Sequence, residues 1–285
     1  MGMTSHDCVG AMRRIMHERR IGHGGTLDPA AMGVLPLAVG RMTRLLRFLG
    51  ENKRYRATIR LGVATDTDDL EGTILYQAPA PHLTFDQVRA ALGTFEGTIE
   101  QTPPRFSAIR RDGKHLYELA RSGEAPALED IAARQVRIDQ IMVLEWRGGD
   151  YPEVMVDVAC GSGTYIRSLA RDLGSALGCG GTLARLVRTA SGLFGIEDSC
   201  DLETVRTQVE DRTLSLISPR VALAHLPVVC LDALDSEAWH FGQQVFWAGE
   251  AHYVQVWDAQ DRFLGIGLST CQKIQPVVVL AQEPG

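Results

Sequence analysis

Residues 22–36 read GHGGTLDPAAMGVLP, a segment in which glycines and prolines surround a single aspartate. Three glycines and a proline between Gly22 and Pro29 predict a loop, because no helix or strand tolerates that density. Pro29 biases Asp28 away from helical backbone angles and keeps it extended at the lip of the turn. From spacing alone, Asp28 is either a reactive carboxylate or the cap of the next element, and His23 is either a ligand or an ordinary loop histidine.

Amphipathic patterns flank this loop on both sides. Apolar residues recur at helical intervals over residues 5–20 and again over residues 41–49, which predicts a helix in each place. On the second helix, Arg41, Arg44 and Arg47 share the polar side. The apolar run between them, from Val34 to Val39, is typical of a short buried strand.

Residues 53–61 predict a strand, because residue types alternate along them. The apolar face is made of Tyr55, Ala57, Ile59 and Leu61. The basic face is made of Arg54, Arg56 and Arg60. An acidic turn follows at residues 65–72, whose carboxylates either bind a divalent cation or stand in solvent. Leu70 occupies the place of the invariant glycine of an EF-hand loop, so the sequence favours a solvated turn.

A second glycine-rich turn, Gly161-Ser162-Gly163-Thr164, connects a strand around residues 154–158 to a helix predicted over residues 164–177. The turn could cradle a phosphate, but it lacks the lysine of a Walker loop and the spacing of a hydrolase nucleophile elbow. Arg167 lies in the first turn of the helix, where the macrodipole disfavours a cation. Such an arginine either has a carboxylate partner or is solvated.

The composition is that of an ordinary globular protein. Of 285 residues, 45% are hydrophobic and 22% are charged. The sequence contains neither the ~18 consecutive apolar residues of a membrane span nor a recognisable N-terminal signal. Six scattered cysteines form no Cys-x-x-Cys pair, which argues against a disulfide framework and a thiolate metal site. We therefore expect a cytoplasmic protein without a membrane partner or a bound metal.

The charge is distributed unevenly. Residues 1–60 hold 11 Lys and Arg against 4 Asp and Glu, whereas the other 225 residues hold 18 against 31. One end of the chain could therefore attract a polyanion. Only three of the basic residues are lysines, and arginine suits bidentate phosphate contacts, although a genome rich in G and C would produce the same bias.

Five motifs follow one another in order between residues 2 and 192. The first is the loop at residues 22–36. The second is Lys53-Arg54-Tyr55 followed by residues 61–68, and the third covers residues 101–121. The fourth is Cys160 to Arg167, and the fifth runs from Leu177 to Arg188. Together these motifs resemble the TruB family of tRNA pseudouridine synthases.

This resemblance implies an α/β (α+β) protein with the pseudouridine-synthase fold, in which helices flank a mixed, largely antiparallel sheet. It implies a catalytic domain at residues 1–225, with an RNA-embracing insertion at about residues 101–133. Residues 226–285 are expected to form a small PUA-like β domain. Because that segment is acidic, we expect its role to be mainly structural.

The resemblance also implies an activity, the isomerisation of uridine 55 in the T loop of tRNA to pseudouridine, with no cofactor. Asp28 is implied as the carboxylate at the ribose, acting as nucleophile or as base, with Arg167 as its ion-pair partner. Tyr55 is implied to stack on the target base, in a position that also suits a catalytic proton transfer after C5 attachment. Leu186 is implied to close the opposite side of the uracil, and Tyr165 to bind substrate. His23 is implied to fill the space that the flipped base leaves.

The implied partner is the T stem-loop of tRNA, and the chain is expected to be a monomer. Basic side chains in three segments are the expected phosphate contacts; they are Arg41 and Arg44, Arg54 and Arg56, and Arg110, Arg111 and Lys114. Two alternatives stay open, a related synthase acting on another RNA and a tRNA-folding chaperone without catalysis. Asp28, Tyr55 and Arg167 speak against a chaperone, which needs a basic surface but no buried carboxylate.

The sequence departs from the family pattern at several positions. Gly24 stands where threonine or serine is usual, Phe106 where tyrosine is usual, and Val187 where arginine is common. Family members generally carry a strand and a Lys-Pro pair before the Gly-x-Thr-Ser found here at residues 2–5. We expect either a natural start further upstream or the lack of an edge strand that supports the site.

Overall fold

The computed structural model describes residues 2–107, 109–111, 113–124, 126–250, 252–270 and 272–280. They form two compact units, each assembled from separate stretches of chain. The first unit comprises Met1–Thr4, Leu27–Val34 and Glu51–Glu197, and the second comprises Ser5–Thr26, Leu35–Gly50 and Asp198–Gly285. The segments on either side of the Asp28 loop thus join the second unit, and the domain boundary expected at residue 225 stays a prediction.

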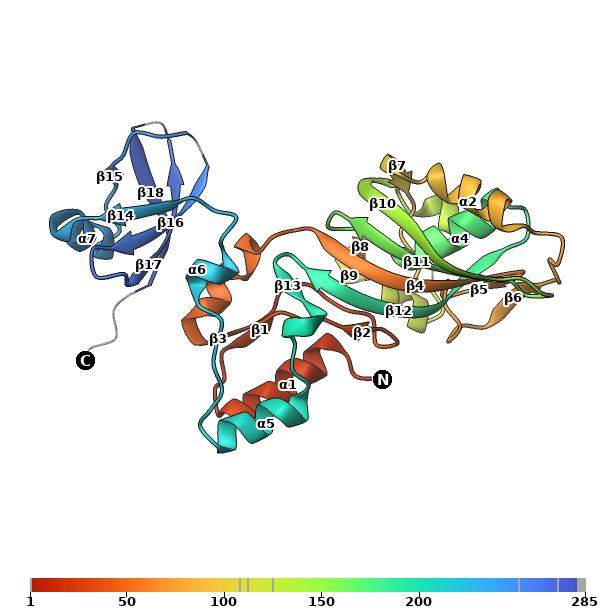
Figure 1. Cartoon of the computed structure of the whole chain (residues 1–285), viewed down its shortest axis with the longest axis horizontal. Helices are drawn as coiled ribbons and strands as arrows, with labels where there is room; N and C mark the ends of the chain where they lie inside the picture. Colours follow the sequence, from red (N-terminus) through yellow and green to blue (C-terminus); the bar gives the residue numbers. More distant parts are fainter. Residues whose placement is uncertain are drawn as a thin grey trace. The chain divides into compact units, whose positions relative to one another are not determined.

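A seven-stranded sheet forms the centre of the first unit (Figure 1). Its strands follow the order β13-β12-β4-β11-β10-β7, and β2 pairs with β12. The β2–β12 pair is parallel and the others are antiparallel, so the predicted mixed, largely antiparallel sheet is confirmed. The bounds are β2 Met32–Gly33, β4 Lys53–Leu61, β7 Gly97–Gln101, β10 Arg134–Arg147, β11 Glu153–Cys160, β12 Gly181–Ser191 and β13 Phe194–Gly195.

The core of this unit lies between the sheet and two helices, α2 (Phe85–Gly93) and α4 (Ile166–Ala176). On β4, Ala57, Ile59 and Leu61 are completely buried, whereas Arg54, Arg56 and Arg60 on the other face are at least partly exposed. The predicted alternation of residues 53–61 is therefore confirmed. Helix α4 is shorter than the helix predicted over residues 164–177. Thr84 caps the start of α2 with a capping box.

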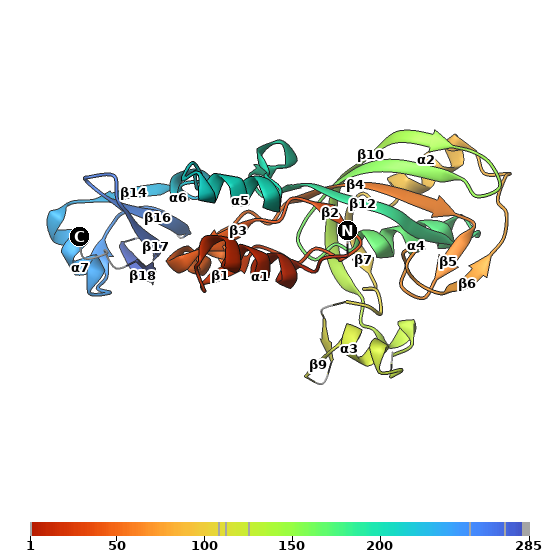
Figure 2. The same cartoon turned by 90° about the horizontal axis from the view of Figure 1, so that it is seen from below.

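The predicted insertion contains short elements, and Figure 2 shows it standing away from the sheet of its own unit. These are β8 Arg110–Arg111, β9 Lys114–His115, α3 Leu116–Arg121 and the 3₁₀ helix η2 Leu128–Asp130. The insertion begins beside α4, where the Gln101 side chain donates to the Tyr165 carbonyl (3.1 Å) and accepts from the Tyr165 amide (2.8 Å). A hairpin of β5 (Val63–Thr65) and β6 (Ile74–Gln77) flanks the acidic turn, and η3 (Ile196–Asp198) follows β13.

The second unit combines N-terminal and C-terminal elements. Its N-terminal part packs α1 (Ser5–Met16) and the paired strands β1 (Ile21–His23) and β3 (Leu37–Val39) with α5 (Leu202–Glu210). The helix expected at residues 41–49 is a 3₁₀ helix, η1 (Gly40–Phe48). Among the residues described, no helix is both long enough and apolar enough to cross a membrane.

The C-terminal part of the second unit is a five-stranded sheet in the order β14-β16-β17-β18-β15. The fully buried Trp239 lies in its core. This confirms the small C-terminal β domain expected from the sequence. Its elements are α6 Pro219–Ala222, β14 Val228–Leu231, α7 Ala233–His240, β15 Val245–Phe246, β16 Tyr253–Asp258, β17 Phe263–Ser269 and β18 Lys273–Val279.

Helix α4 touches the start of β12 through two glycines. A Cβ on Gly174 would lie inside the contact distance of the backbone of Gly180 and Gly181, and a Cβ on Gly181 would meet the carbonyl oxygen of Ala170. The obstacles are backbone atoms, which have no rotamer through which to move away. The helix that carries Arg167 can therefore pack this closely on the sheet only because Gly174 and Gly181 have no side chains.

Gly174→Ala is expected to lower the free energy of unfolding by about 1–3 kcal/mol, the range for overpacking a closed contact. Urea denaturation followed by circular dichroism measures it. Gly93→Ala, at the end of α2 where a Cβ meets open space, is the matched control and is expected to be neutral or stabilising by up to about 1 kcal/mol. Equal midpoints for the two variants would contradict the close packing of α4.

Candidate active site

The Asp28 loop is fastened to β12 by backbone contacts. The Val34 amide donates to the Arg188 carbonyl (2.9 Å), and Met32 and Gly33 pair in parallel with Val187 and Arg188. Gly33 has a positive φ of 109° and lies so close to the Arg188 backbone that a Cβ has no room. The segment after Asp28 is thereby fixed on the sheet, while the Asp28 side chain keeps 37% of its surface exposed.

Arg167 holds Asp28 from the first turn of α4. Its side chain is only 6% exposed, and its Nε donates to Asp28 Oδ2 at 2.8 Å. The other two nitrogens are also used, because Nη1 donates to the Thr67 carbonyl (3.3 Å) and Nη2 to the Phe106 carbonyl (2.9 Å). The ion pair expected from the sequence is therefore present, and three segments of chain satisfy one buried cation.

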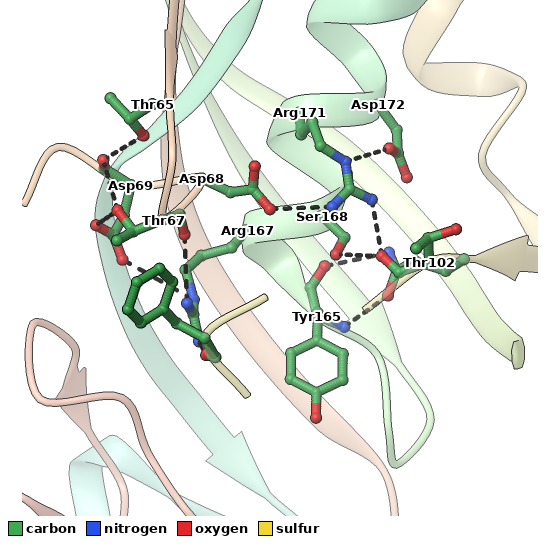
Figure 3. Close-up of polar contacts among 12 residues, drawn as sticks. Thr65, Thr67, Asp68, Asp69, Thr102, Tyr165, Arg167, Ser168, Arg171 and Asp172 are labelled. Carbon is green, nitrogen blue, oxygen red and sulfur yellow. Dashed lines mark hydrogen bonds and ion pairs between the residues drawn. The ribbon is translucent and has the colours of Figure 1, made fainter. Parts of the chain in front are cut away.

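A second carboxylate lies beside the same guanidinium. Asp69 Oδ2 is 3.9 Å from Arg167 Nε. Its other oxygen accepts from the Thr67 hydroxyl (2.6 Å) and the Glu71 amide (3.1 Å), which fixes the carboxylate in the turn. Figure 3 shows Arg167 reaching toward Thr67 and Asp69 from the start of its helix. Arg167 thus lies between two aspartates.

The prediction of a solvated acidic turn at residues 65–72 is wrong. Asp68 is buried, and its Oδ2 pairs with Arg171 Nη1 at 3.0 Å (Figure 3). Arg171 also pairs with Asp172 (2.9 Å) and donates to the Thr102 carbonyl (2.7 Å). The turn is drawn against α4 by arginines about a hundred residues away in the sequence, which its local composition does not reveal.

Burial changes the protonation of this turn. It raises the pKa of Asp68 to about 6, although the positive charges of Arg171 and Arg167 lower it. Burial also raises the pKa of Asp172, again opposed by Arg171. Among the described residues, no three His, Cys, Asp or Glu side chains gather in a way that could hold a metal ion.

The remaining predicted pocket residues lie on the inner face of the sheet or at the start of α4. Tyr55 shares the inner face of β4 with Ala57, and Leu186 is the direct partner of Ala57 on β12. Tyr165 is the residue that precedes α4 and is held by Gln101. Burial raises the pKa of both tyrosines; the nearby Asp28 carboxylate adds to this in each.

The predicted RNA contacts fall into three groups. Arg110, Arg111 and Lys114 lie on the exposed hairpin of the insertion. Arg54 and Arg56 lie on the outer face of β4, opposite Tyr55, where both approach Asp157 of β11 (3.5 and 3.9 Å). The second unit carries the others; Arg41 and Arg44 belong to η1, and Arg44 donates to the Val279 carbonyl (2.7 Å), while His23 ends β1.

Sequence reasoning missed three residues of this site. Asp69 was assigned to a solvated turn, Gln101 was only one letter of a motif, and Arg188 was given no role. Arg188 is 1% exposed, and its place two residues after Leu186 on β12 was the available signal, since residues two apart share a face. A charged side chain on the face of a strand that is otherwise apolar is expected to be buried against a polar partner.

Solved structures share this fold. The chain resembles one in "Crystal Structure of a Cbf5-Nop10-Gar1 Complex" with a TM-score of 0.69 and 26% identity, covering 99% of this chain and 81% of that one. It matches one in "Crystal structure of the archaeal box H/ACA sRNP Nop10-Cbf5 complex" with a TM-score of 0.69 and 25% identity, covering 99% and 82%.

Family descriptions cover most of the sequence and define its class as a pseudouridine synthase. They are "TruB family pseudouridylate synthase (N terminal domain)" at residues 13–166, "tRNA pseudouridylate synthase B C-terminal domain" at 167–222 and "Pseudouridine synthase II TruB, C-terminal" at 227–280. Within that class, the chain belongs to the TruB family. The expected pseudouridine-synthase fold is thereby confirmed.

Two relatives are similar in sequence to this chain over nearly its whole length. The protein "tRNA pseudouridine synthase B" of Gloeobacter violaceus is 54% identical over 280 residues, which are 98% of this chain and 95% of that protein. The protein of the same name from Microcystis aeruginosa is 48% identical over 287 residues, with 98% and 96% covered.

Asp68→Asn is expected to change how stability depends on pH. Because the folded-state pKa of Asp68, about 6, exceeds the unfolded value, the folded state holds the proton more tightly. This contribution is present below pH ~4 and is lost as the pH rises through ~6. Wild type should therefore lose stability relative to Asp68→Asn between those values, as urea denaturation at a series of pH values would measure.

Asp66→Asn is the control for that series, because it lies in the same turn and retains an oxygen that can accept from the Thr73 amide. Its curve is expected to keep the wild-type shape. The quantity to compare is the slope of the free energy of unfolding against pH. Asp68→Asn also weakens the contact with Arg171, which shifts its curve by a constant amount without changing that slope. Parallel curves for wild type and Asp68→Asn would contradict the raised pKa.

Proposed function

We infer that this chain is an isomerase, a tRNA pseudouridine synthase that converts uridine 55 of the T loop to pseudouridine. The observation that carries the inference is the buried Arg167 guanidinium holding the partly exposed Asp28 carboxylate at 2.8 Å. A protein that only bound RNA would not need a carboxylate fixed in this way. About half of the sequence is also identical to curated tRNA pseudouridine synthases over nearly its full length.

The reaction breaks the bond between uracil N1 and ribose C1′ and forms a bond from C5 to C1′. The proton on C5 then leaves and its bonding electrons return to the uracil ring. N1 keeps the electron pair of the broken bond and gains a proton, so the net change is an isomerisation. Asp28 is the group that acts at the ribose or the base, either as a nucleophile or as a base. Arg167 stabilises its negative charge and directs it, because the other guanidinium nitrogens are engaged by Thr67 and Phe106.

Pocket residues around Asp28 would receive the flipped uracil. Tyr55 stacks on the base and accepts or relays the C5 proton, while Leu186 closes the opposite side and Tyr165 contacts substrate. His23 occupies the space that the base leaves in the T loop. Extruding a base costs a few kcal/mol, which these contacts offset.

The RNA surface of this proposal is basic. Exposed Arg110, Arg111 and Lys114 on the insertion, with Arg41 and Arg44 of η1, are its proposed phosphate contacts. Arg54 and Arg56 would take part only if RNA reached the outer face of β4. A monomer in the cytoplasm, with a PUA-like domain from about residue 226, completes the proposal. A synthase acting on another RNA is the second candidate, favoured only by the shared fold.

Asp28→Asn is expected to abolish pseudouridine formation on an unmodified tRNA transcript, because the amide can neither attack nor accept a proton. The affinity for tRNA should stay within about tenfold, or ~1.4 kcal/mol. Position-resolved mapping and filter binding measure the two quantities. Asp86→Asn, on the exposed surface of α2, serves as the control with full activity; turnover by Asp28→Asn at the wild-type rate would refute the assignment.

Arg167→Lys is expected to slow single-turnover catalysis at least about tenfold with little change in tRNA affinity. Lysine keeps the charge but loses the planar fork that reaches Asp28, Thr67 and Phe106 together. Arg89→Lys, which alters an exposed pair with Asp86, should be neutral. If Arg167→Lys weakened binding but left the rate intact, the guanidinium would act in RNA recognition rather than on Asp28.

A further inference from the structure

Arg188 is the most deeply buried arginine among the described residues, with 1% of its surface exposed. Its Nε donates to the Val34 carbonyl at 2.7 Å, and its own carbonyl accepts from the Val34 amide at 2.9 Å. Its side chain also hydrogen-bonds the Tyr55 hydroxyl. Burying a guanidinium is costly unless its donors are used. The contacts of Arg188 with Val34 and Tyr55 therefore indicate its role.

The sheet brings Arg188 to Tyr55 by register. The two residues are direct partners on the antiparallel strands β12 and β4, so their side chains project from the same face. Val158 of β11 is the partner of Tyr55 on its other side. Arg188 is therefore the cation that faces Tyr55 across the ladder, and it contacts the strand that ends the Asp28 loop as well.

We propose that Arg188 is a positioning residue of the active site, which holds the Tyr55 hydroxyl in place and ties its strand to the segment that follows Asp28. The inference rests on the proposed function, because it assigns Tyr55 a part in that reaction. It assigns Arg188 no contact with RNA. Tyr55 on β4 and Val34, on the segment that follows Asp28, come from separate parts of the chain, and the Arg188 side chain bonds to both.

Electrostatics give the same residue a second effect. Burial raises the pKa of Tyr55, and the positive charge and hydrogen bond of Arg188 lower it. The other titratable groups that face Tyr55 are Cys160 at the end of β11 and Asp28, and both raise its pKa. Removing Arg188 should therefore raise the pKa of Tyr55 further and make it a poorer proton acceptor at neutral pH.

The test compares Arg188→Met with Arg188→Lys and with Arg185→Met, an exposed arginine on the same strand. Methionine fills the space without charge or donors, and lysine restores charge alone. Phenolate absorbance, titrated for each protein against its Tyr55→Phe counterpart, isolates Tyr55. We expect the pKa of Tyr55 to rise in Arg188→Met, to rise less in Arg188→Lys and to stay unchanged in Arg185→Met.

Single-turnover rates supply the second readout. Arg188→Met should slow pseudouridine formation at least about tenfold at neutral pH and recover in part at higher pH, whereas in a Tyr55→Phe background the same change should cost less than about threefold. Circular dichroism and tRNA binding show that each variant is folded. If Arg188→Met does not fold, the same measurements on Arg188→Lys decide.

An unchanged Tyr55 titration in a folded Arg188 variant, or equal rate losses with and without Tyr55, would overturn the inference. Failure of the proposed function is distinguishable from this, because wild type would then form no pseudouridine at all. The titration would still report whether Arg188 governs Tyr55.

Discussion

The arrangement of the active site depends on one buried cation. Arg167 is 6% exposed at the start of a helix, where the macrodipole adds to the cost of burying its charge. That cost is met only if every nitrogen finds an acceptor, and the acceptors come from three separate segments, Asp28, Thr67 and Phe106. The Asp28 loop, the acidic turn and the root of the insertion therefore converge because they satisfy the same side chain.

A second arginine one turn further along α4 repeats this device. Arg171 binds Asp68 of the acidic turn and the Thr102 carbonyl at the start of the insertion. Two residues four apart on a helix face the same way. Helix α4 therefore contacts both the acidic turn and the insertion through each of two arginines, Arg167 and Arg171. The close seating of α4 against β12 through Gly174 and Gly181 gives both arginines a rigid base.

The sequence predicted what rests on local periodicity. The strand at residues 53–61 and the helix carrying Arg167 followed from spacing, and the macrodipole argument raised the carboxylate partner of Arg167. The acidic turn was misjudged because its partner Arg171 lies about a hundred residues away in the sequence. Arg188 was missed because its role depends on Tyr55, its partner on the neighbouring strand. At residues 41–49 the apolar spacing predicted a helix but did not distinguish 3₁₀ from α geometry.

Register explains why such a site tolerates little change in its strands. Side chains alternate with a period of two, so a slip of one residue would turn Tyr55 to the outer face and bring Arg56 inward. Such a slip would bury an unpaired arginine and separate Tyr55 from Arg188. Gly33 opposes it from the other edge, because its contact with the Arg188 backbone fits only one alignment of β2 on β12. The contacts that hold the reactive groups together thus also fix the alignment of the strands that carry them.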